Sequence, residues 1–250
     1  MSATIDYPAL YQLAGSNRQA YQSATPFPHI IIEDQIDPKC LERVLAEFPG
    51  QEELKYWRRN VVQHDDVEMQ IGKLGFSNEH VMSAVIRNLI WELNAAPFLG
   101  FLEQLTGIEN LIPDPTLRGG GLHQIEPGGR LGIHADFTRH PVYDLDRRLN
   151  LLLFLNKDWP DDYAGHLELW SNDLSRCEKS IRPIFGRMVI FSTNAVSFHG
   201  HPQALSCPPG MTRRSVALYY YTNSELDENV SPTPDTDWRT LPEVERPPHQ

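Results

Sequence analysis

The stretch GGRLGIHADF, residues 128–137, decides how the rest of this 250-residue sequence is interpreted. Its second half, from Leu131 to Asp136, is predicted to be a β-strand, and on a strand residues i and i+2 project from the same face. His134 and Asp136 therefore direct an imidazole and a carboxylate to one side, where both can bind one cation. The pattern His-x-Asp is weak evidence by itself, because any two polar residues on a solvent-facing strand produce it.

A third ligand is expected from a distant part of the chain. His199 lies well downstream in FSTNAVSFHGHP, just after the apolar strand MVIF. Two histidines and one carboxylate on one face of an octahedron leave three positions open, which is the arrangement that Fe(II) oxygenases use for a cosubstrate and O2. His201 competes with His199 for this role, because it lies two residues away and can share its face.

A change of pattern near residue 117 predicts the fold class. From there on, short β-branched and aromatic runs are separated by Gly, Pro, Asn and Asp, which is typical of an antiparallel sandwich or barrel. Strands are expected at residues 122–125, 131–136, 149–155, 166–170, 184–191 and 213–222.

The first half of the chain is predicted to contain helices. Asp37 can cap a helix that Pro38 opens. Two further helical patterns run over about residues 77–94 and from Pro97 to Gly107. Helices that precede strands fit a mainly β protein, a jelly roll whose N-terminal helices pack outside one sheet.

The length is sufficient for one catalytic domain with a sizeable core. We expect an N-terminal extension at 1–26, the domain at 27–222 and a Pro-rich acidic tail at 223–250. The prolines of the tail prevent regular structure over any long stretch.

The net charge of -11 and the pI near 5.3 make nucleic acid an unexpected partner, because the field of the protein repels a phosphate backbone. The pair Arg147 and Arg148 leaves two readings open. It lines a locally basic cleft, or it is a solvated pair near the start of a strand.

The three cysteines, Cys40, Cys177 and Cys207, have no short paired spacing. Their scatter argues against a zinc ribbon or a disulfide scaffold and favours a reducing compartment, the cytoplasm. Because no stretch approaches the roughly 18 apolar residues of a spanning helix, and the N-terminus lacks a basic region followed by an apolar run, we expect neither export nor a membrane partner.

The sequence resembles the prolyl 4-hydroxylase-like 2-oxoglutarate oxygenases over roughly residues 27–222. The resemblance implies a double-stranded β-helix (a cupin-like jelly roll), iron at His134, Asp136 and His199, and a basic residue on the last strand that pairs with the far carboxylate of 2-oxoglutarate. The matching phrases are LTGI (105–108), GGGLH (119–123), GGRLGIHADF (128–137), RRLNLLLFLNKDW (147–159), AGHLELW (164–170), FHGHP (198–202) and TRRSVALYYYT (212–222).

Strand alternation selects Arg213 as that basic residue. Adjacent side chains on a strand point to opposite faces. Arg213 shares its face with small residues that leave room for a diacid, whereas Arg214 shares its face with a bulkier apolar set that suits packing against a neighbouring layer. The two sets are Ser215, Ala217 and Tyr219 for Arg213, and Val216, Leu218 and Tyr220 for Arg214.

The sequence departs from the pattern of hypoxia-type prolyl hydroxylases at one position. Those enzymes carry a Tyr that helps to hold the cosubstrate, and this chain has Phe154 there. Asn150, on the same strand face, is the expected replacement anchor. His123 is expected either to line the cosubstrate or substrate pocket or to be a satisfied core histidine.

The function implied by the resemblance is an Fe(II)- and 2-oxoglutarate-dependent dioxygenase. Such an enzyme uses O2 to hydroxylate an unactivated C–H bond and releases succinate and CO2. The substrate is expected to be a small molecule or a peptidyl residue, prolyl residues included. The alternative is a non-catalytic β-barrel that binds a metal or ligand as a sensor.

Overall fold

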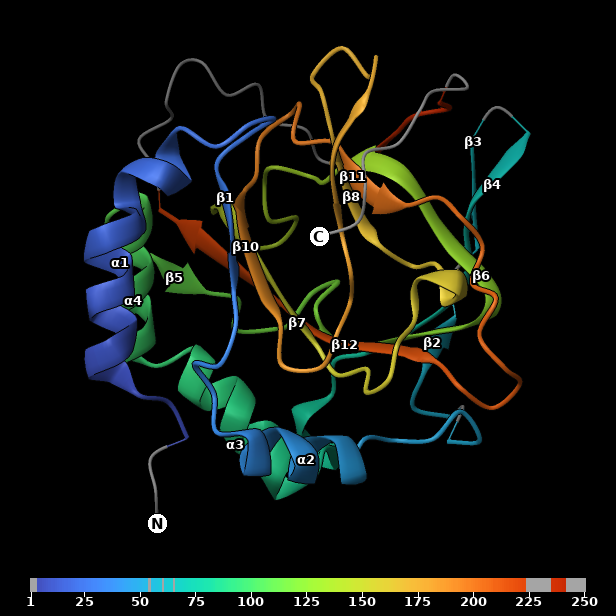
Figure 1. The fold of residues 1–250 in the computed structure, drawn as a ribbon, viewed down its shortest axis with the longest axis horizontal. Helices are drawn as coiled ribbons and strands as arrows, with labels where there is room; N and C mark the ends of the chain where they lie inside the picture. The colour runs from blue at the N-terminus through green and yellow to red at the C-terminus, as the bar shows by residue number, and fades with distance from the viewer. Residues whose placement is uncertain (1–3, 54, 60, 65, 224–234, 242–250) are drawn as a thin grey trace.

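The fold is a curled antiparallel sheet with helices on its outside (Figure 1). The computed structural model describes residues 4–53, 55–59, 61–64, 66–223 and 235–241. Within them, the main path of the sheet runs β1-β10-β7-β12-β6-β11-β8-β9, and every neighbouring pair on it is antiparallel. These strands are β1 (His29–Ile32), β6 (Gly121–Ala135), β7 (Asp146–Phe154), β8 (Leu167–Trp170), β9 (Cys177–Ile181), β10 (Met188–Ser192), β11 (His199–His201) and β12 (Arg213–Thr222).

The long strand β6 joins the two halves of this sheet. Its first part pairs with β12 and its end pairs with β11, so the sheet closes around an interior as in a jelly roll. The sequence predicts two separate strands here, at 122–125 and 131–136. They form one strand because Gly128, with a φ of 78°, lets the chain bend without ending the pairing.

Five further strands extend the sheet at its margins. The hairpin strand β4 pairs with β6, which adds a wall of residues that the sequence analysis did not expect. Its mixture of polar and apolar residues, VEMQIGKLGF, gave no clean period. These strands are β2 (Arg58–Arg59), β3 (Val62–His64), β4 (Val67–Phe76), β5 (Ile112–Pro113) and β13 (Asp237–Trp238).

Three helices lie near the predicted positions. The carboxylate of Asp37 accepts a hydrogen bond from the Lys39 amide and caps α2 (Pro38–Ala46), as predicted. Helix α4 (Ala96–Thr106) ends at Gly107, which adopts a left-handed conformation.

The helix expected over residues 77–94 is shorter than predicted. Helix α3 (Ala84–Leu93) begins at its cap Ser83, whose hydroxyl accepts a hydrogen bond from the Ile86 amide. A separate 3-10 turn, η1 (Glu79–Val81), precedes it, and Val81 is exposed. The helical pattern expected over residues 77–94 is therefore divided by the Ser83 cap, and only its second part forms an α-helix.

Helix α1 (Tyr7–Gln22) was not predicted from the sequence. It packs along α4, with Leu10, Ala14 and Tyr21 buried, and the Tyr21 hydroxyl lies 2.8 Å from Ser192 Oγ on β10 (Figure 1). Its polar composition hides the narrow buried stripe. Residues before 27 thus contribute to the core of the protein, while the domain limits drawn from the sequence remain a prediction.

The main hydrophobic core lies between the helices and the outer face of the sheet. The helices cover the outer face of the sheet (Figure 1). The inner face of the same strands lines the interior, where a site can form. None of the described helices is long and apolar enough to cross a membrane. The sheet residues of this core are Leu149, Leu151, Leu153, Met188, Ile190, Val216, Leu218 and Tyr220, along with others from β4 and β6.

Replacing Leu10 with Ala tests whether α1 is integral to the fold. Because Leu10 is fully buried, the cavity left behind should lower the free energy of unfolding by about 2–5 kcal/mol in urea denaturation. Gln12→Ala on the exposed side of α1 is the control and should change it by less than about 0.5 kcal/mol. Equal effects of the two substitutions would mean that α1 is not packed as described.

Candidate active site

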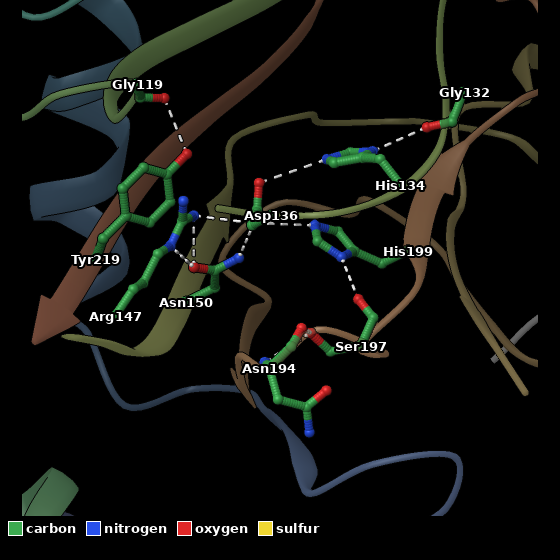
Figure 2. Close-up of polar contacts among 10 residues, drawn as sticks. All are labelled: Gly119, Gly132, His134, Asp136, Arg147, Asn150, Asn194, Ser197, His199 and Tyr219. Atoms are coloured by element: carbon green, nitrogen blue, oxygen red, sulfur yellow. Dashed lines mark hydrogen bonds and ion pairs between the residues drawn. The ribbon is translucent and has the colours of Figure 1, made fainter. Parts of the chain in front are cut away.

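Three side chains that can hold one metal ion meet inside the curled sheet. His134 and His199 are cross-strand partners on β6 and β11, and Asp136 follows β6 directly. Their ligand atoms lie within 4.8 Å of one another. Asp136 places one carboxylate oxygen 3.6 Å from His134 Nε2 and the other 3.4 Å from His199 Nε2 (Figure 2).

The two imidazoles are oriented by backbone carbonyls. Nδ1 of His134 lies 2.9 Å from the carbonyl oxygen of Gly132, and Nδ1 of His199 lies 2.9 Å from that of Ser197 (Figure 2). With Nδ1 donating its proton, each Nε2 directs a lone pair at the shared point. Burial, reinforced by the neighbouring His134 ring, lowers the pKa of His199 to about 4, so this ring is neutral and ready to bind a metal at pH 7.

Asp136 is held by an arginine and an asparagine. Its Oδ2 atom accepts hydrogen bonds from Arg147 Nη2 at 2.9 Å and from Asn150 Nδ2 at 2.7 Å. Arg147 also donates to the amide oxygen of Asn150, and it lies 3.5 Å from the centre of the Tyr219 ring (Figure 2). Burial is the largest single influence and raises the pKa of Asp136, but Arg147, the His134 contact and the charge of His199 together outweigh it and hold the pKa of this carboxyl well below its usual range.

This arrangement distinguishes between the two interpretations of Arg147, a residue of a basic cleft and a solvated surface residue. Its side chain is buried, so the interpretation as a solvated surface residue is wrong, and it sits beside the metal-ligand cluster. Arg148 is partly exposed and donates to Thr222 Oγ1. Asn150 lines the cavity, yet both ends of its amide are engaged by Asp136 and Arg147, which leaves its predicted role as a cosubstrate anchor without a free group.

A cavity lies directly beside the three candidate ligands, and Arg213 faces into it. Arg213 is 5% exposed, donates from Nε to the carbonyl oxygen of Gly165 at 2.6 Å, and makes no ion pair with a described residue. Burial lowers its pKa to about 9, so the guanidinium remains a buried cation at neutral pH. A Cβ at residue 165 would lie 2.9 Å from Arg213 Cδ, which explains the glycine.

Arg214 points to the other face of β12. Its guanidinium lies over the ring of Phe48, 5.3 Å from the ring centre, and the residues that share its face join the outer core. The alternation predicted for β12 is therefore confirmed: Arg213 faces the interior and Arg214 does not.

His201 and His123 both lie in the wall of the cavity but outside the metal-ligand cluster. Neither ring nitrogen of the buried His201 has a hydrogen-bond partner among the described residues. Burial lowers the pKa of both histidines well below the usual value. His123 lines the cavity and also has a hydrogen bond with the backbone of Gly119, so its role in binding stays a prediction.

Lys73 is a cavity residue that the sequence analysis missed. It comes from β4, half-buried, and lines the same cavity as Arg213. Burial lowers its pKa to about 8. The available signal was a lone lysine in the otherwise uncharged run QIGKLGF, but no strand was expected there.

An aromatic residue of β13 packs against one of the candidate ligands. Strand β13 pairs with the end of β6, and the Trp238 ring packs against His134 with 4.7 Å between ring centres and 31° between the ring planes. Most of the tail expected at 223–250 lies outside the described residues, 235–241 excepted.

Residues 120–221 match the family described as the 2OG-Fe(II) oxygenase superfamily. They include nearly all the residues that form the cavity, so this part of the chain is similar to the 2OG-Fe(II) oxygenases where the candidate ligands lie. The chain is 26% identical over 216 residues to mouse prolyl 3-hydroxylase OGFOD1, a match that covers 81% of this chain and 36% of the mouse protein. The chain thus spans about a third of the length of this curated relative.

Solved structures show the same fold. A prolyl hydroxylase from Trichoplax adhaerens, in complex with a hypoxia inducible factor peptide, has a TM-score of 0.58 at 16% identity and covers 86% of this chain and 90% of its own. HygX from Streptomyces hygroscopicus, with nickel and 2-oxoglutarate bound, has a TM-score of 0.53 at 11% identity and covers 89% and 96%. The double-stranded β-helix expected from the sequence is confirmed.

The buried histidines predict how stability depends on pH in the metal-free protein. Between pH 7 and 5 the unfolded chain takes up protons on its imidazoles, whereas the buried rings of His123, His199 and His201 stay neutral. The free energy of unfolding should therefore fall as the pH falls, by about 1.4 kcal/mol per pH unit for each proton of difference. Urea denaturation across this range measures the slope.

Two variants test whether the buried histidines cause this dependence of the free energy of unfolding on pH. His201→Asn should reduce it, while His80→Asn, at an exposed position, should leave it unchanged. A free energy of unfolding that stays constant from pH 7 to 5 would contradict the assignment of neutral buried rings.

Proposed function

We propose that this chain is an Fe(II)- and 2-oxoglutarate-dependent hydroxylase in which His134, Asp136 and His199 bind the iron. The observation that carries the proposal is the combination of three ligand atoms within 4.8 Å and a buried, unpaired Arg213 in one cavity. The reaction consumes O2 and 2-oxoglutarate, hydroxylates an unactivated C–H bond and releases succinate and CO2.

The donor set fits Fe(II). Two imidazoles and one carboxylate on one side of the ion leave open positions for a cosubstrate and O2. The iron, when bound, supplies the redox chemistry that activates O2 for C–H oxidation. Arg147 and Asn150 keep Asp136 ionised and fix its orientation, so the carboxylate is in place before the metal arrives.

The buried guanidinium fits the cosubstrate. A planar cation with free N–H groups in a dry cavity binds a carboxylate strongly, because little water competes for it. We assign the far carboxylate of 2-oxoglutarate to Arg213. The hydroxyl of Ser215, which lines the same cavity, replaces Asn150 as the proposed second contact, since the amide of Asn150 is engaged by Asp136 and Arg147.

The substrate proposal draws on the relatives. OGFOD1 is named a prolyl 3-hydroxylase, the Trichoplax enzyme was solved with a peptide, and HygX was also solved with hygromycin B bound. We propose a peptidyl substrate, with prolyl residues first, and a small molecule as the second choice. We place the reaction in the cytoplasm, which agrees with three free cysteines.

A passive metal-binding barrel is the competing function. Anaerobic addition of Fe(II) and 2-oxoglutarate separates the two, because the enzyme should give a visible charge-transfer band and then form succinate when air is admitted. The unpaired Arg213 favours the enzyme, since a barrel that binds only a metal has no use for a buried cation beside it. A peptide library screened for substrate-stimulated succinate release then identifies the substrate.

Single substitutions of the proposed ligands should remove both iron and turnover. His134→Ala, Asp136→Ala and His199→Ala should each lose the iron while the fold survives, because the ligands line a cavity on a large scaffold. Iron stoichiometry and circular dichroism measure the two effects. His201→Ala is the matched comparison and should retain iron; a variant series in which His201→Ala loses iron and His199→Ala keeps it would replace His199 with His201 as the third ligand.

Arg213→Ala should raise the 2-oxoglutarate requirement by about 100- to 1,000-fold with iron affinity little changed, because removing one partner of a buried ion pair costs roughly 3–5 kcal/mol. Arg214→Ala, on the opposite face of β12, should require 2-oxoglutarate as wild type does. Titration of 2-oxoglutarate against succinate formation compares them. A larger defect in the Arg214 variant would contradict the assignment.

A further inference from the structure

A second cavity of about 280 Å³ adjoins the one that holds the candidate ligands. The two cavities share Lys73 and His123 in their walls. The outer cavity is formed by strands β2 and β4 on one side and by the loop before β6 on the other, and Phe137, the residue after Asp136, also lines it. An occupant of the outer cavity would therefore lie next to the proposed iron site.

The lining of the outer cavity is cationic. Arg58, Lys73 and Arg118 all face it, and none of its described lining residues is Asp or Glu. None of these three side chains makes an ion pair or side-chain hydrogen bond with a described residue. This is unusual in a chain of net charge -11, whose other arginines often pair, as Arg59 does with Glu126.

Arg58 and Arg118 are exposed and solvated, whereas Lys73 is half-buried, and no acidic side chain of the described lining offsets the positive potential that the three create in the cavity. Burial lowers the pKa of the half-buried Lys73 to about 8, so this ammonium is partly desolvated yet remains largely protonated at pH 7. An anion in the cavity would offset both the positive potential and the desolvation cost. The charge pattern therefore fits an anionic ligand better than a neutral or a basic one.

We infer that the outer cavity binds an anionic group of the primary substrate, a carboxylate or a phosphate, and thereby places a neighbouring carbon beside the iron. This inference rests on the proposed function, and it defines the substrate class as acidic. Because the two cavities meet at Lys73 and His123, one substrate molecule can place its anionic group in the outer cavity and the carbon that is oxidised in the inner one.

The cosubstrate does not account for this cavity. Its far carboxylate has a buried partner in Arg213, which lines the inner cavity and not the outer one. Arg58 and Arg118 line the outer cavity only. Binding of 2-oxoglutarate at Arg213 would thus leave the outer cations without a counter-charge.

Anion binding is measured first, on the metal-free full chain. Inorganic phosphate and acetate are the probes, and ligand-observed NMR measures their binding. Both wild-type protein and the control Arg59→Gln, whose side chain pairs with Glu126, should bind at least one of them. Arg58→Gln/Arg118→Gln should bind about 10-fold more weakly for each charge-assisted hydrogen bond lost.

The two probes distinguish a phosphate group from a carboxylate group as the anion that the cavity binds. A clear preference for phosphate assigns a phosphorylated substrate, and a preference for acetate assigns a carboxylate. No binding of either anion, or equal binding by wild type and the double variant, would overturn the inference.

Measurement of turnover is the second part of the experiment. Matched pairs of candidate substrates, peptides with Glu or Gln and with phosphoserine or serine beside the same residue, are compared for stimulation of succinate release. The acidic member should be the better substrate, and the double variant should raise its KM while leaving the 2-oxoglutarate requirement unchanged. Equal use of both members, or a raised 2-oxoglutarate requirement in the double variant, would refute an acidic-group site.

The two proposals fail in different ways. Anion binding that depends on the two arginines, with no succinate formed under any condition, would contradict the proposed enzyme and leave an anion site. Succinate formation that ignores the acidic group would contradict the anion site and leave the enzyme.

Discussion

The buried ion pair between Asp136 and Arg147 is the interaction on which the site depends. A carboxylate inside a protein must be compensated, because desolvation of an isolated charge costs far more than the fold can supply. Arg147 provides the charge and Asn150 completes the hydrogen bonds. The second oxygen and the two imidazole nitrogens are left directed at a single point, so the ion pair determines which lone pairs remain for a metal.

The sheet brings distant residues together at that point. His134 and His199 are far apart in the chain and directly opposite across two antiparallel strands. The alternation of β12 adds a cation on the same interior side, while its other face supplies Val216 and Leu218 to the helix-covered core. One face of β12 therefore packs in the hydrophobic core, and the other lines the cavity of the candidate active site.

Local rules of strand geometry made much of this predictable. The two-residue spacing of His134 and Asp136 and the alternation of Arg213 with Arg214 needed only the identification of a strand. The cap at Asp37 was equally local. Arg147 was not predictable in the same way, because its partner is eleven positions earlier and the two meet only through the curl of the sheet, in which β12 lies between β7 and β6.

Helix α1 and strand β4 were missed for a related reason. Their residues are polar enough to pass for exposed segments, and only the packing of Leu10 on α4 and the pairing of β4 with β6 give them structure. Lys73 was overlooked with its strand. Tertiary contacts, which a single sequence does not display, decide such elements.

The contact between the rings of Trp238 and His134 has a consequence for how the protein can be observed. An indole ring in contact with a candidate metal ligand is within range for quenching by an open-shell transition ion, whereas a closed-shell ion such as zinc quenches it little. The intrinsic fluorescence of this tryptophan is thus a native optical probe of the centre. Because Trp238 belongs to a strand near the end of the described chain, the same signal also reports whether that strand is seated on β6.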